Sequence, residues 1–91
     1  MSAHHSREDL YRFLWEKRDY QGVVTMSQGE IAEEFGISYQ RLSIAMSEFI
    51  GMNMIHKYRH RFTLLYEPDI IPWNNGFKDL RKRYLKSRNL T

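Results

Sequence analysis

The residues best suited to recognise a pattern of hydrogen-bonding groups lie in one short polar stretch, residues 38–47. A glutamine can bond in bidentate fashion to adenine and an arginine to guanine, and an aliphatic side chain can meet the methyl group of thymine. Hydroxyl groups suit phosphate contacts, which fix register without specifying sequence. If a helix begins here, its exposed face carries Ser38, Tyr39, Gln40, Arg41, Ser43, Ile44 and Ser47. This face is a candidate for base recognition, and the alternative interpretation is a solvated helix surface.

Two predicted helices must position this stretch. Ser27 and Glu30 have the spacing of a capping box, in which each side chain binds a backbone N–H group at the start of a helix. Gly36 is suited to end that helix in the left-handed conformation, and Ser38 can cap the next one. The helix after Ser38 should end near residues 51–53, where Asn53 tolerates a positive φ. Its buried side follows helical spacing: Leu42, Ala45, Met46, Phe49 and Ile50.

An alternating pattern replaces the helical one over residues 54–66 and predicts two short strands joined by a turn within residues 56–61. Lys57, Arg59 and Arg61 fall in this hairpin. They could lie along a phosphate backbone, or Arg59 could enter a minor groove. The alternative is a hairpin whose charges protect an exposed strand edge from aggregation.

Further elements flank this central part. A first helix should run from Ser6 to about Asp19, and residues 23–26 should form a brief strand or extended segment. Residues 69–76 are expected to be a connector that includes the Asn75-Gly76 pair. A final helix should start at Phe77, with one apolar side and one basic side.

The basic side of the final helix has several interpretations. It could add phosphate contacts through Lys78, Arg81 and Lys82, as Ser27 and Gln28 could from the earlier helix. The apolar side could pair with a second subunit or pack on its own domain. An arrangement on an anionic membrane is disfavoured, because the apolar face is short and interrupted.

The order of these elements, together with specific residues, resembles the winged helix-turn-helix family. The segment SQGEIAEEFGIS (residues 27–38) is similar to the family pattern in which a capped helix with an Ile/Leu-Ala pair runs into Gly-Ile/Val-Ser. Asn53-Met54-Ile55 stands where the family commonly has Gly-Leu-Ile. The likeness covers about residues 10–66, and the following helix fits it through Leu42, Ser43, Ala45, Met46 and Phe49. A looser likeness, over residues 66–76, is to winged-helix replication and regulatory proteins of plasmids and phages.

The resemblance implies a mainly α fold with a small β-hairpin (α+β). A winged helix-turn-helix would occupy residues 6–68, after a disordered tail at 1–5 and before a connector and basic helix at 69–91. It implies sequence-specific binding of double-stranded DNA, with residues 38–51 in the major groove and residues 56–61 on the backbone or minor groove. Transcriptional regulation, or plasmid or phage replication or recombination, would be its setting. A homodimer or cooperative array could form through the first or last helix.

This sequence departs from the family in the charge of the predicted recognition helix. Many members place Arg or Lys where this chain has Ile44, Ser47 and Glu48. Glu48 would be repelled by DNA unless it accepts from a cytosine amino group or faces away from the groove.

Composition limits the other function classes. The 91 residues suffice for one small core, and the net charge of +3 is uneven: residues 1–35 carry −3 and residues 77–91 carry +5. There is no cysteine, signal sequence or long apolar run, which predicts a cytoplasmic protein with no membrane partner. The four histidines, at 4, 5, 56 and 60, lack partners with metal-ligand spacing, so no metal is expected. No cofactor motif or catalytic grouping is found, which argues against an enzyme.

Two other binding functions remain open from the sequence. A winged helix can act as a protein-interaction module, for instance a small phage-like adaptor without DNA binding. The weakly charged helix face with Tyr39 and Ile44 favours that alternative. Binding of double-stranded RNA is a third hypothesis.

Overall fold

The computed structural model describes residues 6–89, which form a mainly helical chain with a small three-stranded antiparallel sheet. This confirms the α+β class predicted from the sequence, whereas the predicted tail at residues 1–5 lies outside the described residues. The elements follow in the order α1 (Arg7–Lys17), β1 (Val23–Val24), α2 (Gln28–Phe35), α3 (Tyr39–Gly51), β2 (Ile55–Tyr58), β3 (Arg61–Leu64), the 3-10 turn η1 (Pro68–Ile70) and α4 (Asn75–Asn89).

The helix boundaries follow from local side-chain hydrogen bonds. Ser27 accepts from the backbone N–H of Glu30, whose side chain accepts from the N–H of Ser27, so the predicted capping box is formed. Ser38 caps α3 through the N–H of Arg41, and Gly36 ends α2 with φ of 90°. The prediction that α1 reaches about Asp19 is wrong by two residues. The carboxylate of Asp19 instead accepts from backbone N–H groups of the following turn, which competes with helix continuation.

The sheet has the strand order β1-β3-β2, so β1 pairs with the outer side of the predicted hairpin. Lys57 pairs with Phe62 and Tyr58 with Arg61, which leaves only Arg59 and His60 in the turn. The turn therefore lies within the predicted range 56–61. Because Arg59 adopts φ of 57°, the turn forms without glycine, at a backbone cost of about 1 kcal/mol.

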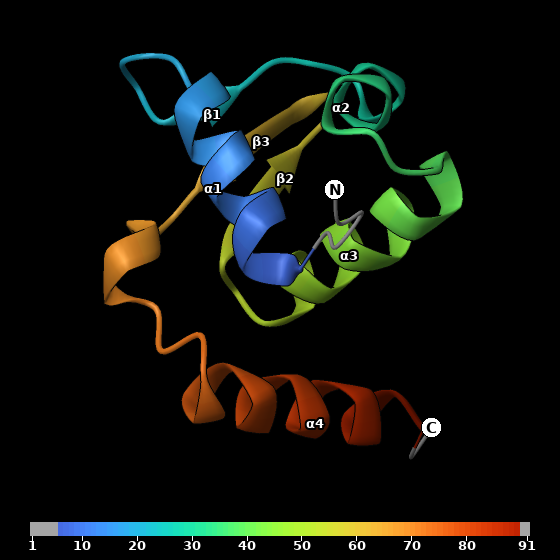
Figure 1. The fold of residues 1–91 in the computed structure, drawn as a ribbon, viewed down its shortest axis with the longest axis vertical. Coiled ribbons are helices and arrows are strands. Elements are labelled where there is room, and N and C mark those ends of the chain that lie inside the picture. The colour runs from blue at the N-terminus through green and yellow to red at the C-terminus, as the bar shows by residue number, and fades with distance from the viewer. Residues whose placement is uncertain (1–5, 90–91) are drawn as a thin grey trace.

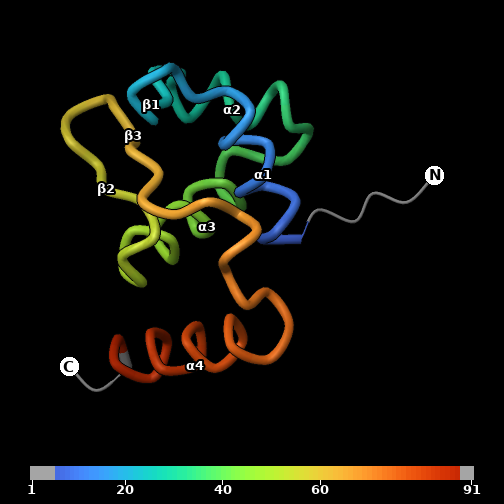
Figure 2. The backbone as a smooth tube through the Cα atoms, turned by 90° about the vertical axis from the view of Figure 1, so that its left-hand side faces the viewer, coloured from blue at the N-terminus to red at the C-terminus, as the bar shows by residue number. Residues whose placement is uncertain are grey.

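The core lies between α1, α3 and the sheet. Tyr11 at its centre is fully buried, and its ring meets Phe49 edge-on at 5.4 Å. The Tyr11 hydroxyl donates to the carbonyl of Tyr66 at 2.7 Å, which joins α1 to the segment after β3. Figures 1 and 2 show α3 between the β2–β3 hairpin and α4, in two views at right angles.

Helix α4 begins at Asn75, so the prediction that Asn75 and Gly76 belong to the connector is wrong. The N–H of Phe77 donates to the carbonyl of Pro72, and the Gly76 α-carbon lies so close to the Pro72 ring that a β-carbon would overlap it. Gly76 thus permits a tight entry into the helix. Phe77 is buried, and its ring lies 4.9 Å from that of Trp73.

Candidate nucleic-acid interface

The exposed side of α3 carries the residues that the sequence singled out. Leu42, Ala45, Met46 and Phe49 are buried on the opposite side, so core packing fixes which side faces solvent. Ile44 and Tyr39 expose 56% and 57% of their surfaces, which is high for large apolar groups. Ser43 is half-buried at the edge of this face, and the remaining members are exposed: Ser38, Gln40, Arg41 and Ser47.

A shallow hollow joins the start of α2, the start of α3 and the hairpin. Its walls include Gln28, Tyr39, Lys57 and Arg59, and Ser27 lies at its edge. Gln28 is half-buried, and its Oε1 is a buried atom without a hydrogen-bond partner among the described residues. The structure therefore brings together three groups of predicted site residues that are separate in the sequence. It also gives the hollow two cationic side chains and one unpaired amide oxygen.

The hairpin cations are all exposed: Lys57 lies on β2, Arg61 on β3 and Arg59 in the two-residue turn between them. The Arg59 guanidinium lies 5.4 Å from the centre of the Tyr58 ring, and the Lys57 ammonium lies 6.0 Å from that of Phe62. Such contacts with aromatic faces contribute about 0.5–1 kcal/mol at exposed sites. Lys57, Arg59 and Phe62 all line the hollow, so two of the hairpin cations border it.

Glu48 is bound by two arginine side chains, which were not predicted from the sequence. Its side chain is 2% exposed, although it belongs to the helix whose other side is solvated. The Arg81 guanidinium donates to both carboxylate oxygens, at 2.8 and 3.1 Å, and Arg7 Nε donates to one of them at 2.9 Å. Burial alone would raise the pKa of Glu48, but the hydrogen bonds from Arg81 and Arg7 hold it below its ordinary value. This Arg7–Glu48–Arg81 cluster joins α1, α3 and α4.

The cluster resolves how Glu48 avoids the candidate interface. Its carboxylate points away from the exposed stripe of α3 toward α1 and α4, one of the two outcomes expected from the sequence. Helical spacing offered a hint, because Glu48 lies beside the buried positions Ala45 and Phe49 on the helix circumference. The partners are 41 and 33 residues away in the chain, so no local signal identified them.

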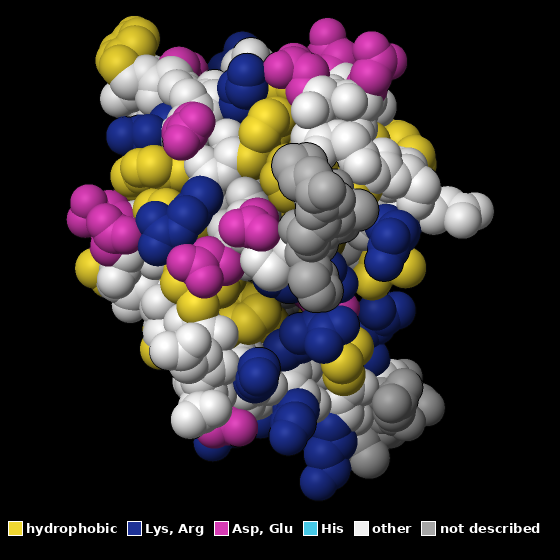
Figure 3. All heavy atoms as spheres, viewed as in Figure 1, with side chains coloured by type: hydrophobic (Ala, Val, Ile, Leu, Met, Phe, Trp, Pro, Cys, Tyr) yellow, Lys and Arg dark blue, Asp and Glu magenta, His cyan; other side chains and the backbone are white. Residues whose placement is uncertain are grey.

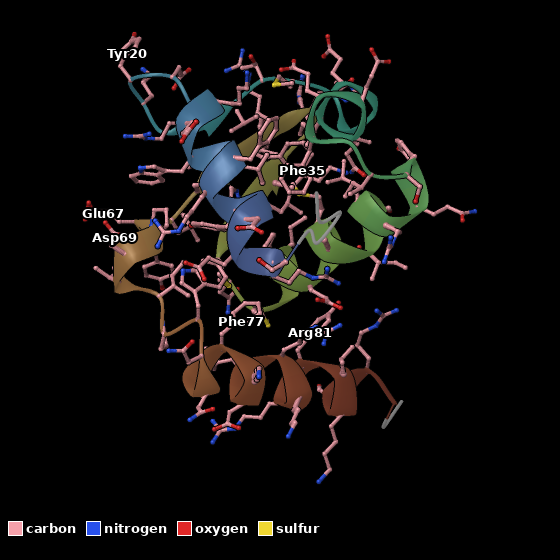
Figure 4. All side chains as sticks on the ribbon, viewed as in Figure 1. Tyr20, Phe35, Glu67, Asp69, Phe77 and Arg81 are labelled. Atoms are coloured by element: carbon pink, nitrogen blue, oxygen red, sulfur yellow. The ribbon has the colours of Figure 1, made fainter. Side chains whose placement is uncertain are left out.

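The basic side chains of α4 fall into two groups. Arg81 uses two guanidinium nitrogens on Glu48, and Phe77, Arg81 and Tyr84 define the side of α4 that faces α1 and α3. Figure 4 shows Phe77 and Arg81 projecting from α4 toward these helices. By helical periodicity Lys82, Arg83 and Lys86 lie on the far side, and all three are exposed. Lys78 lies at the flank, next to the start of α1.

Two groups of like charge lie at opposite ends of the molecule. Figure 3 shows acidic side chains over α2 at one end and Lys and Arg side chains over α4 at the other. The acidic end consists of Glu30, Glu33 and Glu34, which are exposed. The exposed face of α3 lies between these two ends.

Over residues 6–89, no three His, Cys, Asp or Glu side chains come together as potential metal ligands. None of the described helices has the length and apolar character needed to cross a membrane.

Comparison with known proteins gives no match to a protein-family model, to a curated protein or to a solved structure.

Proposed function

We propose that this chain is a winged helix-turn-helix protein that binds double-stranded DNA in a sequence-dependent manner. In this proposal α2 and α3 are the helix-turn-helix, α3 enters the major groove, and the β2–β3 hairpin is the wing. The order helix, strand, helix, helix, strand, strand supports it, as does the pairing of β1 with the hairpin. The major groove, about 12 Å wide, accepts one α-helix.

The single observation that carries the proposal is the exposed face of α3 beside the hollow. Core packing uses only one side of this helix, and the other side presents Gln40, Arg41 and Ile44 to solvent. These three side chains have the hydrogen-bonding and apolar groups that discriminate base pairs. Lys57 and Arg59 line the hollow at the edge of this face, where a phosphate backbone flanking the groove would pass.

The start of α2 completes the proposed phosphate contacts. Backbone N–H groups in the first turn of a helix favour anions, and Ser27 and Gln28 add side-chain donors there. The amide nitrogen of Gln28 can donate to a phosphate oxygen, whereas its unpaired Oε1 is an acceptor and would need a donor from another part of the DNA. Arg81, by contrast, contributes to this surface through Glu48 and α4 rather than as a direct phosphate contact.

One domain of this size offers few base contacts, so we expect a homodimer or a cooperative array on repeated half-sites. Half-sites would be spaced by one helical turn, about 10 base pairs, or a multiple of it. Regulation of transcription, or replication or recombination of a plasmid or phage, is the setting that such binding suits.

The proposal is tested by selecting bound fragments from a random duplex library and then measuring affinity across salt concentrations. We expect Arg41→Ala to reduce affinity for the selected site by about 1–3 kcal/mol and to relax preference at one base pair. Arg59→Ala should weaken binding to all duplexes alike and lower the salt slope by about one. Arg18→Ala is the matched control, because Arg18 follows the end of α1 that lies away from α3 (Figure 1).

Two results would contradict the proposal. No enrichment of any duplex at low salt would exclude DNA as the partner, and equal binding by all three variants would exclude this surface. The large exposed fractions of Tyr39 and Ile44 favour a protein-interaction module as the second candidate function. That candidate predicts no retardation of random genomic fragments even at low salt.

A further inference from the structure

A cavity of about 300 Å³ lies between the start of α1, the connector and the first turns of α4, away from the hairpin. Its apolar part is formed by the rings of Trp73 and Phe77, and its polar part by Arg7, Lys78 and Arg81. The volume lies at the lower end of the range of small-molecule sites, which are mostly apolar with a few convergent polar groups. The proposed DNA interface uses none of these five residues as a direct contact.

The aromatic wall is held in place by its own contacts. Trp73 Nε1 donates to the carbonyl of Pro68 at 2.8 Å, so the indole cannot rotate freely. One side of the indole contacts the buried Tyr11 ring at 5.6 Å and another the Phe77 ring at 4.9 Å. A fixed aromatic surface that is already ordered loses little entropy when a flat ligand packs on it.

The cationic groups in the wall retain unused donors. Arg7 binds Glu48 through Nε alone, and Arg81 binds it through Nε and Nη2. Neither terminal nitrogen of Arg7, nor Nη1 of Arg81, nor the Lys78 ammonium has a protein partner in the part of the chain that the structure describes. Because Glu48 fixes both guanidiniums, their remaining N–H groups are oriented before any ligand arrives.

The acidic residue at the rim does not cancel this positive charge. Glu8 also borders the cavity, but its Oε2 accepts from Arg12 Nε at 3.0 Å. Glu48 balances one of the two arginines, and Arg12 is shared between Glu8 and Asp69, so these groups together leave a net excess of one positive charge. A neutral apolar molecule would leave these cations without an acceptor, whereas an anionic group attached to a ring would satisfy them.

We propose that this cavity binds a small organic anion with a planar ring, its phosphate or carboxylate facing Arg7 and Lys78 and its ring packed on Trp73. The site does not depend on DNA binding, so it can be tested on the protein alone. Arg7 and Arg81 also hold Glu48 of α3, so an occupant of the cavity would contact two of the side chains that attach α1 and α4 to that helix.

The test uses the indole N–H signal of Trp73 in two-dimensional NMR of the full chain. Phenyl phosphate is the probe, and inorganic phosphate and benzyl alcohol supply its charge and its ring separately. A Trp15→Phe variant assigns the two indole signals. We expect phenyl phosphate to shift the Trp73 signal with saturation at low millimolar concentration, and either half alone to bind at least about fivefold more weakly.

Matched lysine variants locate the binding. Lys78→Ala should weaken phenyl phosphate binding by roughly fivefold, the effect of losing one exposed ion pair. Lys82→Ala removes the same charge from the far side of α4 and should leave binding unchanged. Equal effects of the two variants, or no saturable shift of Trp73 up to about 20 mM, would overturn the proposal. Equal binding of phenyl phosphate and inorganic phosphate would also overturn it, because the ring would then have no role.

Discussion

The Arg7–Glu48–Arg81 cluster gives the sharpest test of how the fold is held together. The substitution Glu48→Gln keeps the size and shape of the side chain but removes its charge. The amide oxygen can keep the two bonds from Arg7 Nε and Arg81 Nε in weaker form, while the amide nitrogen takes the place of Oε2 and faces the Arg81 Nη2 donor. The variant therefore weakens the attachment of α1 and α4 to α3 without creating a cavity.

The magnitude follows from burial. Hydrogen bonds to charged groups contribute about 1.5–3 kcal/mol each when buried. Arg7 and Arg81 expose 26% and 41% of their side chains, so water can solvate them once Glu48 is neutral, and most of that value is recovered. We expect a net loss of about 2 kcal/mol in the free energy of unfolding, below the 3–5 kcal/mol typical of a fully buried pair. For a domain of this size the midpoint temperature should fall by about 8–16 °C.

The assay is thermal and urea unfolding followed by circular dichroism at pH 7. Glu8→Gln is the control, because Glu8 pairs with Arg12 at 3.0 Å and both side chains are about 40% exposed. That control should lose no more than about 0.5 kcal/mol. A Glu48→Gln variant as stable as the Glu8→Gln variant would refute the reasoning that the cluster stabilises the fold.

The pH dependence provides an independent check. Because the pKa of Glu48 is lowered in the folded state, its contribution is fully present above the pKa of an unfolded glutamate, about 4.3. The contribution is lost as pH falls through the lower folded value. The stability difference between wild type and Glu48→Gln should therefore shrink below about pH 4. A difference that is unchanged at pH 3 would show that the carboxylate charge is not its source.

Three further predictions concern contacts that only the folded chain makes. A methyl group at Gly51 would overlap the Tyr84 ring, so Gly51→Ala should lower the free energy of unfolding in urea by about 1–3 kcal/mol. Adding Tyr84→Ala should relieve this overlap, and stability losses that simply add in the double variant would contradict the contact. Tyr11→Phe leaves the Tyr66 carbonyl without its 2.7 Å donor and should lower the free energy of unfolding by about 1–2 kcal/mol. A loss below about 0.3 kcal/mol, which is about the error of the assay, would mean that water replaces the hydroxyl. Arg59→Gly removes the strain of a positive φ but raises the conformational entropy of the unfolded chain. The free energy of unfolding should therefore stay within about 0.5 kcal/mol of the wild-type value, while duplex binding should weaken. A large loss of stability would show that the contact of Arg59 with the Tyr58 ring contributes more than the relief of backbone strain.

The helix boundaries show how much could be predicted locally. The serine caps of α2 and α3 and the left-handed Gly36 each act within a few residues, and all were predicted correctly. Asn53 adopts the expected positive φ of 61°. The errors occur where a neighbour outside that window intervenes. Asp19 binds the backbone of the next turn, and Gly76 packs under Pro72, which shifts the end of α1 and the start of α4.

The candidate site shows the same division. Its residue types and the exposed side of α3 follow from helical periodicity, because the apolar positions determine which side is buried. The hollow could not be predicted, since it depends on a two-residue turn at Arg59 and His60 that brings Lys57 near Gln28 and Tyr39. No glycine marks that turn, and the strain at Arg59 is tolerated because the strand pairs on either side fix it.

The sequence alone determined which segments are helices, their order and the side of each that faces solvent. Capping and amphipathic periodicity depend only on residues close together in the chain. Only the tertiary structure decided where Glu48 points, where α4 lies and that a cavity opens beside Trp73. These features depend on contacts between residues 41 and 33 positions apart in the chain. A glutamate looks the same in the sequence whether its carboxylate is solvated or buried. For Glu48, the packing of α1, α3 and α4 around the carboxylate determines that it is buried.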